Sequence, residues 1–201
     1  GSPAGGLWKS TTGGTSWTTN TDGLASLGVT DIAIDPSNPN IMYLATGDGE
    51  LGSTYSVGVL KSTNGGNTWN TTGLNWVITQ TSKITKLLIN PSNVSMIFAA
   101  TNGGIYRSTN AGTSWTEVLN INNVEDIEFQ PGNSSVIYAT ASDDFYRSTD
   151  SGLNYSLITS GLPSSATSRY AIGVTPADAN YVYLLACNGT NGGFYGLYRS
   201  T

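Results

Sequence analysis

Short runs of β-branched and aromatic residues alternate with turn-forming residues along the whole chain. One unit has an apolar run at 29–36, a turn at 37–40 and a second apolar run at 41–46. Equivalent pairs of runs lie at 84–101, 124–140 and 170–186, and in each the first run ends at a proline. Runs of this length, bounded by Pro, Ser, Gly and Asn, predict antiparallel hairpins. No segment has the 3.6-residue apolar period of a helix.

A third apolar run in each unit ends in a lysine or arginine, and a recurring string follows it. The string reads Lys-Ser-Thr-x-x-Gly-x-x-Trp at 9–17 and 61–69, close variants occupy 107–115 and 147–155, and a further copy begins at Arg199. The serines of these strings lie at 10, 62, 108, 148 and 200, so the repeat is 40 to 52 residues long. A period of this length is typical of propellers and solenoids.

The recurring string predicts a tight turn between a third strand and a fourth strand that carries the terminal aromatic residue. The serine and the turn-forming residue two places later offer oxygens to main-chain N–H groups across the loop. The glycine supplies a positive φ, and the aromatic residue folds back to bury apolar area beside the hairpin. The residues expected in these structural roles are Ser10, Gly14, Trp17, Ser62, Asn64, Gly66, Trp69, Ser108, Asn110, Gly112, Trp115, Ser148, Asp150, Gly152 and Tyr155.

Four short antiparallel strands per unit predict an all-β protein, a β-propeller of four-stranded blades with about four blades present. We expect blade parts at 1–28 and blades at about 29–73, 84–120, 124–161 and 170–201. The chain opens on third and fourth strands and stops at a third strand, which favours a segment of a larger propeller. The remaining blades of a larger chain, or a partner subunit, would then cover the flanks of the terminal blades.

Composition excludes several classes of partner. Charged residues make up 10% of the chain, the net charge is −5, and only eight residues are Lys or Arg. No basic patch can neutralise the phosphates of nucleic acid or attract an anionic membrane. No apolar run approaches the length of a membrane span, so direct membrane insertion is not expected. A surface solvated by Ser, Thr, Asn and Gly is common in secreted all-β proteins and predicts an extracellular or cell-surface location.

Two residue counts limit the available chemistry. Histidine is absent, which removes the usual general base and the commonest metal ligand. The single cysteine, Cys187, lies in an apolar run and cannot form an internal disulfide. We expect Cys187 to be a buried strand residue rather than a nucleophile, because a catalytic cysteine needs a partner base.

At the recurring string the chain resembles the Asp-box (BNR-repeat) propellers, whose motif is Ser-x-Asp-x-Gly-x-x-Trp. That group includes sialidases, sortilin-type receptor domains, xyloglucan-cleaving hydrolases and photosystem II assembly propellers. The resemblance covers essentially the whole chain, although Thr12, Asn64 and Asn110 stand at the Asp position. A narrower likeness over 45–63 is to sortilin-like propellers in large secreted proteins of Bacteroidota, many of them exported by the type IX secretion system.

These families define which chemistry to look for. A sialidase needs three arginines around one carboxylate, whereas Arg107, Arg147 and Arg199 share one repeat position and are expected on successive blades. A glycosidase needs two carboxylates about 5–5.5 Å or 6.5–9.5 Å apart. Asp31 and Asp126 share one position in innermost strands, where they would either line the propeller channel as solvated residues or act in a xyloglucanase-like reaction. No residue is assigned a catalytic role.

Two insertions and one isolated tryptophan provide the candidate binding residues. The insertion at 47–58 carries Asp48, Glu50 and Tyr55, and the loop at 188–195 carries Phe194 and Tyr195. Aromatic side chains in such loops can stack on sugars or hold a peptide, and Trp76 is a further candidate. The oxygens of Asp48 and Glu50 could hold a Ca²⁺ ion, although their spacing is not that of an EF-hand. No other cofactor is expected.

The sequence favours a non-enzymatic binding or scaffolding propeller of a secreted or cell-surface bacterial protein, with a protein or a glycan as ligand. The principal alternative is part of a glycan-active hydrolase propeller of the xyloglucanase type. A docking factor for the assembly of a membrane complex is the third hypothesis.

Overall fold

The chain is almost entirely strands and turns. The computed structural model describes residues 5–49, 54–163 and 167–200. One 3₁₀ turn, η1 (Ile78–Gln80), is the sole helical element among them, so no described helix is long enough to span a membrane. The strands are β1 (Trp8–Lys9), β2 (Thr18–Thr19), β3 (Val29–Ile34), β4 (Met42–Thr46), β5 (Gly58–Ser62), β6 (Asn70–Asn75), β7 (Ile84–Ile89), β8 (Ile97–Thr101), β9 (Gly104–Ser108), β10 (Thr116–Asn120), β11 (Val124–Gln130), β12 (Asn133–Ala141), β13 (Asp144–Ser148), β14 (Ser156–Ile158), β15 (Thr167–Val174), β16 (Val182–Asn188) and β17 (Phe194–Arg199).

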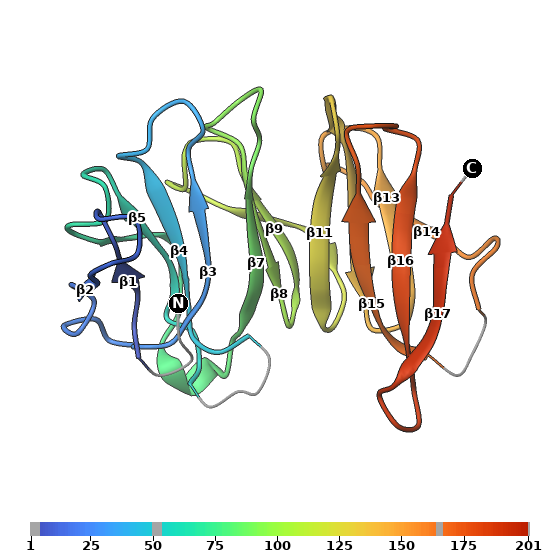
Figure 1. The fold of residues 1–201 in the computed structure, drawn as a ribbon, viewed down its shortest axis with the longest axis horizontal. Helices are drawn as coiled ribbons and strands as arrows, with labels where there is room; N and C mark the ends of the chain where they lie inside the picture. The colour runs from blue at the N-terminus through green and yellow to red at the C-terminus, as the bar shows by residue number, and fades with distance from the viewer. Residues whose placement is uncertain (1–4, 50–53, 164–166, 201) are drawn as a thin grey trace. The chain divides into compact units, whose positions relative to one another are not determined.

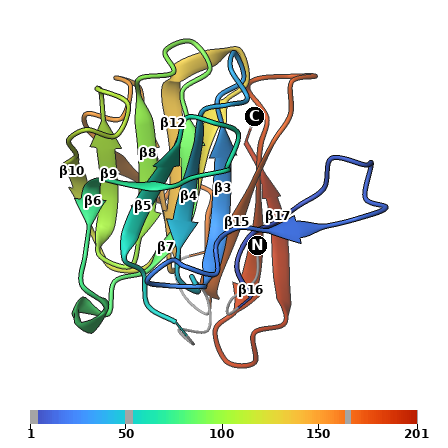
Figure 2. The same ribbon diagram turned by 90° about the vertical axis from the view of Figure 1, so that its left-hand side faces the viewer.

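Strands that follow one another along the chain are neighbours in each sheet (Figure 1). Three sheets have four strands, in the orders β3-β4-β5-β6, β7-β8-β9-β10 and β11-β12-β13-β14. The sheet β15-β16-β17, whose strands are labelled in Figure 2, has three strands, and β1 pairs with β2 alone. The predicted meander of short antiparallel strands is therefore present. The recurring aromatic residues lie just before the fourth strands rather than in them.

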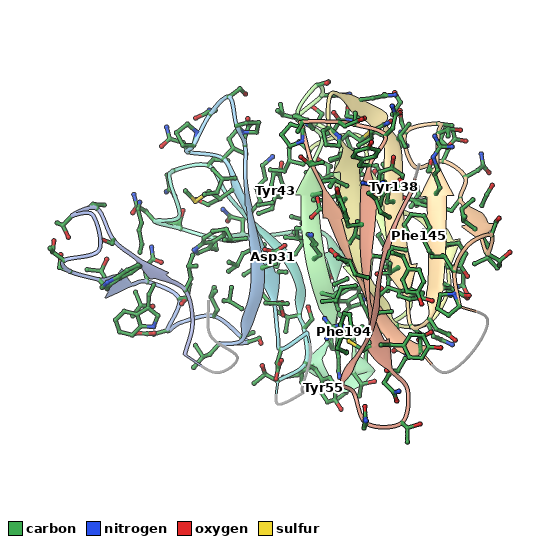
Figure 3. All side chains as sticks on the ribbon, turned by 45° about the vertical axis from the view of Figure 1, so that its right-hand side comes forward. Asp31, Tyr43, Tyr55, Tyr138, Phe145 and Phe194 are labelled. Carbon is green, nitrogen blue, oxygen red and sulfur yellow. The ribbon has the colours of Figure 1, made fainter. Side chains whose placement is uncertain are left out.

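The chain divides into two compact units. Unit 1 comprises residues 1–99 and 108–115, and unit 2 comprises residues 100–107 and 116–201. In unit 1, Leu7, Leu24, Ile32 and Trp69 pack against the buried residues Val29, Leu44 and Leu60. In unit 2, the rings of Tyr138 and Phe145 stack with centroids 5.9 Å apart (Figure 3). They belong to a core that also contains Val136, Tyr170, Val182, Leu184 and Ala186.

The hairpin between the first two strands is closed by the residue before its proline. Asp35 Oδ1 accepts the N–H groups of Ser37 and Asn38 and the hydroxyl of Ser37. These bonds, the Ser37 hydroxyl first among them, hold the pKa of Asp35 below its usual value. Asn90 accepts the equivalent N–H groups in the sheet that begins with β7. The turn is thus fixed by an Asx side chain, because a short side chain can bond to main chain two or three residues on.

All four complete recurring turns share one hydrogen-bond pattern. Ser62 Oγ accepts the N–H of Gly66 at 2.8 Å, and Asn64 Oδ1 accepts the N–H of Thr68 at 2.9 Å. The corresponding serines accept from their glycines at 2.8–3.0 Å, and each glycine has a positive φ between 74° and 90°. The oxygens of Thr12, Asn110 and Asp150 take the place of the Asn64 amide oxygen. A hydroxyl, an amide and a carboxylate therefore all satisfy this position.

Asp150 gives one turn a pH dependence that the others lack. Its carboxylate accepts from the Asn154 side chain and N–H, the Ser148 hydroxyl and the Leu153 N–H, which lowers its pKa to about 2. Because the folded pKa lies below the ordinary value of 3.8, the resulting stability is complete above pH 3.8 and is lost as pH falls towards 2. We expect Asp150→Asn to flatten the acid limb of the stability profile in this window. Thermal melting from pH 5 to pH 2 measures it.

The matched control for Asp150 is the turn that already carries an amide. Asn110 stands at the same repeat position and makes the equivalent bonds to Ser114. Asn110→Asp should therefore add acid sensitivity over the same pH range. Equal acid limbs in Asp150→Asn and the unmodified protein would contradict this account.

In three of the repeats, the cation at the end of the third strand contacts the next recurring turn. Lys9 Nζ donates to the carbonyl of Gly65 at 2.7 Å, and Lys61 Nζ donates to that of Ala111 at 3.0 Å. In unit 2, Arg107 Nε donates to the carbonyl of Ser151 at 2.9 Å. Each acceptor residue has a positive φ, between 55° and 70°. We call this recurring bond the cation contact. It links the third strand of one sheet to the recurring turn of the next sheet along the chain.

Candidate functional site

The carboxylates of Asp31 and Asp126, on the first strands of their sheets, accept hydrogen bonds from main-chain N–H groups. Asp31, labelled in Figure 3 on β3, accepts the N–H of Ile32 through Oδ1 and that of Leu87 through Oδ2, both at 2.8 Å. Asp126 Oδ2 accepts the N–H of Ile172 at 2.9 Å at the equivalent place in unit 2. Each carboxylate thus joins the first strands of two successive sheets, β3 with β7 and β11 with β15. Neither of the two sequence-based hypotheses, solvated channel residue or catalytic acid, anticipates this bridging geometry.

The insertion at 47–58 is held by a buried network at its two ends. Thr46 Oγ1 accepts the N–H of Val57 at 3.0 Å and donates to the carbonyl of Gly58 at 2.7 Å. Ser56 Oγ accepts the N–H of Gly58 at 2.9 Å. Gly47 has a φ of 95°, and a Cβ there would lie 2.8 Å from the nitrogen of Ser56. The chain closes so tightly at this point that only glycine fits.

The network places Tyr55 and Trp76 on neighbouring segments of unit 1. The carbonyl of Tyr55 accepts the Ser26 hydroxyl at 3.2 Å, and the N–H of Trp76 donates to the carbonyl of Val57 at 3.1 Å. Both aromatic side chains are half-buried. The structure therefore places two candidate binding residues, 21 positions apart in the sequence, on adjacent main-chain segments.

Sequence reasoning missed two apolar residues beside Trp76. Val77 is 64% exposed and Ile78 is 48% exposed at the start of η1. The signal was present, since three apolar residues in a row follow the fourth strand β6, whereas at most one of the three residues after each other fourth strand is apolar. We call Tyr55, Trp76, Val77 and Ile78 the aromatic edge of unit 1.

Of the two predicted Ca²⁺ ligands, Asp48 and Glu50, the structure describes only Asp48. Asp48 is buried, and its N–H donates to the carbonyl of Thr54 at 2.8 Å. Glu50 lies outside the described residues. Over residues 5–49, 54–163 and 167–200, no group of three or more His, Cys, Asp or Glu side chains is arranged to hold a metal ion. Asp48 lies seven positions before Tyr55 in the sequence. The Ca²⁺ site stays a prediction.

Phe194 and Tyr195 lie in unit 2, on the first residues of β17 rather than in a loop. The turn before them is closed by bonds from the N–H of Asn188 to the carbonyl of Gly193 and from that of Gly192 to the carbonyl of Asn188. Phe194 is 74% exposed and lies opposite Cys187.

Phe194 shares one sheet face with Leu185 and Leu197, which are opposite each other and 44% and 63% exposed. Cys187 is on the same face and is half-buried, so the expectation that it is buried was wrong. The apolar run around it contributes to both faces of its sheet, and Cys187 belongs to the exposed one.

Comparisons with known proteins agree on the architecture. No family model matches the sequence. A xyloglucanase from Paenibacillus sp. is 33% identical over 103 residues, which make up 48% of this chain and 10% of that protein. An ancestral GH74 enzyme superposes with a TM-score of 0.75 and 24% identity. The superposition covers 94% of this chain and 25% of the chain of that enzyme. The GH74 xyloglucanase from Xanthomonas campestris gives a TM-score of 0.71 with 18% identity, over 98% of this chain and 33% of its own.

The chain thus spans 10% of the curated relative and a quarter to a third of the two solved structures. At these identities the likeness to the solved structures concerns the fold alone. The predicted fold class is confirmed: the chain is an all-β protein with the fold of a partial β-propeller of about four blades.

Proposed function

We propose that this chain is a glycan-binding segment of a xyloglucan-active propeller and that the aromatic edge of unit 1 contacts the glycan. The observation that carries the proposal is the 33% identity to a xyloglucanase over 103 residues. Among the hypotheses from the sequence, this one was the alternative; the scaffolding hypothesis receives no comparable support.

The aromatic edge has the chemistry that a sugar chain requires. Sites for small ligands combine apolar and aromatic walls with a few well-placed polar groups. Tyr55 and Trp76 supply rings with a polar handle, and Val77 and Ile78 extend the apolar surface. Low charge suits a neutral polysaccharide, because such a ligand offers no ionic partner. Among the described residues, Asp48 is the acidic group nearest to Tyr55 in sequence, and its side chain is buried.

We assign a structural role rather than acid–base chemistry to the carboxylates of Asp31 and Asp126. A general acid must be able to give its proton to the substrate, and a nucleophile must reach the anomeric carbon. Both carboxylates instead accept main-chain N–H groups of the next sheet. We further propose that the recurring turns are Asp-boxes and that the propeller is of the sortilin-like type. We also propose that the protein is secreted, with the type IX system as its export route. The low charged fraction and the abundant Ser, Thr, Asn and Gly support secretion.

Removal of the Trp76 ring is expected to weaken xyloglucan binding about tenfold, since loss of about 1.4 kcal/mol of contact corresponds to that factor. Affinity electrophoresis in gels containing xyloglucan measures the change, with dextran gels as the control polysaccharide. Trp76→Phe should bind with intermediate affinity because it keeps an aromatic ring. Trp17→Ala is the matched control: this tryptophan is 56% exposed and lies outside the aromatic edge. Equal migration of Trp76→Ala and the unmodified protein would refute the assignment, provided that both melt at similar temperatures.

A further inference from the structure

The chain contains four Asn-Gly pairs, at 64–65, 102–103, 188–189 and 191–192. An Asn-Gly pair can deamidate when the main-chain nitrogen of the glycine attacks the side-chain carbonyl carbon of the asparagine. Glycine permits this approach because it has no Cβ beside the attacking nitrogen. In a folded protein the attack also requires that the glycine N–H is not already committed to a hydrogen bond.

Two of the pairs lie where the fold binds the glycine N–H. The N–H of Gly65 donates to the carbonyl of Asn40 at 2.9 Å. The N–H of Gly103 donates to Oγ1 of the buried Thr101 at 3.1 Å. Each bond has to break before the nitrogen can attack, and breaking it costs free energy. The fold therefore protects both pairs.

The other two pairs lie in the turn between β16 and β17 and differ from each other. The N–H of Gly192 donates to the carbonyl of Asn188 at 2.8 Å, so the second pair is protected as well. The N–H of Gly189 has no acceptor among the residues that the structure describes. Oδ1 of Asn188 accepts the N–H groups of Thr190 at 2.8 Å and Asn191 at 3.3 Å. These bonds hold the Asn188 side chain against its own turn.

We propose that Asn188 is a deamidation site of the folded protein. The nitrogen of Gly189 gives its proton to water and forms a bond to Cγ of Asn188. The negative charge that develops on Oδ1 is stabilised by the N–H groups of Thr190 and Asn191, which act as an oxyanion hole. The bond from Cγ to Nδ2 then breaks, and ammonia leaves. Water opens the resulting cyclic imide at either carbonyl, which gives aspartate or isoaspartate.

Deamidation changes the turn that leads into β17. The product carries one additional negative charge in a chain whose net charge is −5. In the isoaspartate product, the carbonyl group that accepts the Thr190 N–H becomes part of the main chain, which is longer by one carbon atom. The modification therefore alters the segment directly before Phe194 and Tyr195, two of the candidate binding residues.

Peptide mapping by mass spectrometry, after incubation of the 201-residue chain at mildly alkaline pH, tests the proposal. Asn188 should deamidate at least about fivefold faster than Asn64, Asn102 and Asn191, the factor that corresponds to one hydrogen bond of typical strength. In denaturant no glycine N–H is held, so the four rates should converge. Equal rates in the folded chain would overturn the proposal. A lead of Asn188 that persists unchanged in denaturant would overturn it too, because the fold would then play no part.

Two substitutions test the chemistry, each with circular dichroism to confirm that the strands remain. Gly189 has no positive φ, so Gly189→Ala fits the backbone and places a Cβ beside the attacking nitrogen. Deamidation at Asn188 should then fall towards the rates of the protected pairs, and an unchanged rate would contradict the proposal. Thr101→Val removes the acceptor of the Gly103 N–H. Asn102 should then deamidate about fivefold faster while the rate at Asn188 stays the same.

Discussion

Alanine at Gly58 is expected to lower the free energy of unfolding by about 2–5 kcal/mol, the sum of a left-handed backbone penalty and overpacking. Gly58 has a φ of 105°, which side chains rarely adopt. A Cβ there would collide with the carbonyl oxygen of Leu74 and lie 2.6 Å from Cα of Asn75. Both obstacles are main chain of β6, so neither can move aside as a flexible side chain would. Chemical denaturation followed by circular dichroism measures the loss.

Gly23→Ala is the matched control for Gly58→Ala. A Cβ at Gly23 would meet no atom within 4 Å, and Gly23 has no positive φ, so the change should stay within about 0.5 kcal/mol. Gly104 stands at the repeat position of Gly58 and would meet the Leu119 carbonyl, so Gly104→Ala should also be severely destabilising. If Gly58→Ala and Gly23→Ala unfolded at the same denaturant concentration, the close approach of β5 and β6 would be wrong.

Asn in place of Asp31 is expected to lower the free energy of unfolding by about 1.5–3 kcal/mol, the range for hydrogen bonds to a charged group. The carboxylate accepts one N–H on each oxygen, from Ile32 and from Leu87. An amide can accept through one atom only, and its NH₂ group faces the other donor. One of the two N–H groups would then lack an acceptor, which would weaken the link between β7 and β3. Chemical denaturation gives the magnitude.

Asp22→Asn controls for the loss of a negative charge. Asp22 is exposed and receives only a bond of 3.5 Å from the Thr19 hydroxyl, so its replacement should stay within about 0.5 kcal/mol. Asp126→Asn should resemble Asp31→Asn, because Asp126 holds the N–H of Ile172 in the same way. Unchanged stability in Asp31→Asn combined with lost xyloglucan hydrolysis in the parent protein would instead identify a catalytic carboxylate.

The sheets could be predicted because strand periodicity and turn residues recur in every unit. Alternating β-branched and aromatic residues leave few other ways to bury apolar surface, and proline marks the end of each first strand. The recurring turns follow the same logic, since a serine, a short polar residue and a glycine can satisfy the loop main chain locally. Local chemistry determines these features, so one sequence suffices to predict them.

Features that depend on the neighbouring sheet could not be read from the sequence. From the sequence, Asp31 and Asp126 are expected to be channel carboxylates. The structure shows that each accepts an N–H from the first strand of the next sheet. Gly58 looks like an ordinary loop glycine until β6 passes within contact distance. Trp17 repeats the motif of Trp69 but stays exposed, because burial depends on the strands beside it rather than on the motif.

Indole N–H signals in ¹⁵N-edited NMR spectra test the central claim, glycan binding at the aromatic edge, most directly. The chain has five tryptophans, all within unit 1, and each can be assigned by a single substitution to phenylalanine. Addition of xyloglucan oligosaccharides to dilute protein should shift the Trp76 signal and leave the Trp17 signal in place. A glycan titration in which the Trp76 signal does not move would contradict the account.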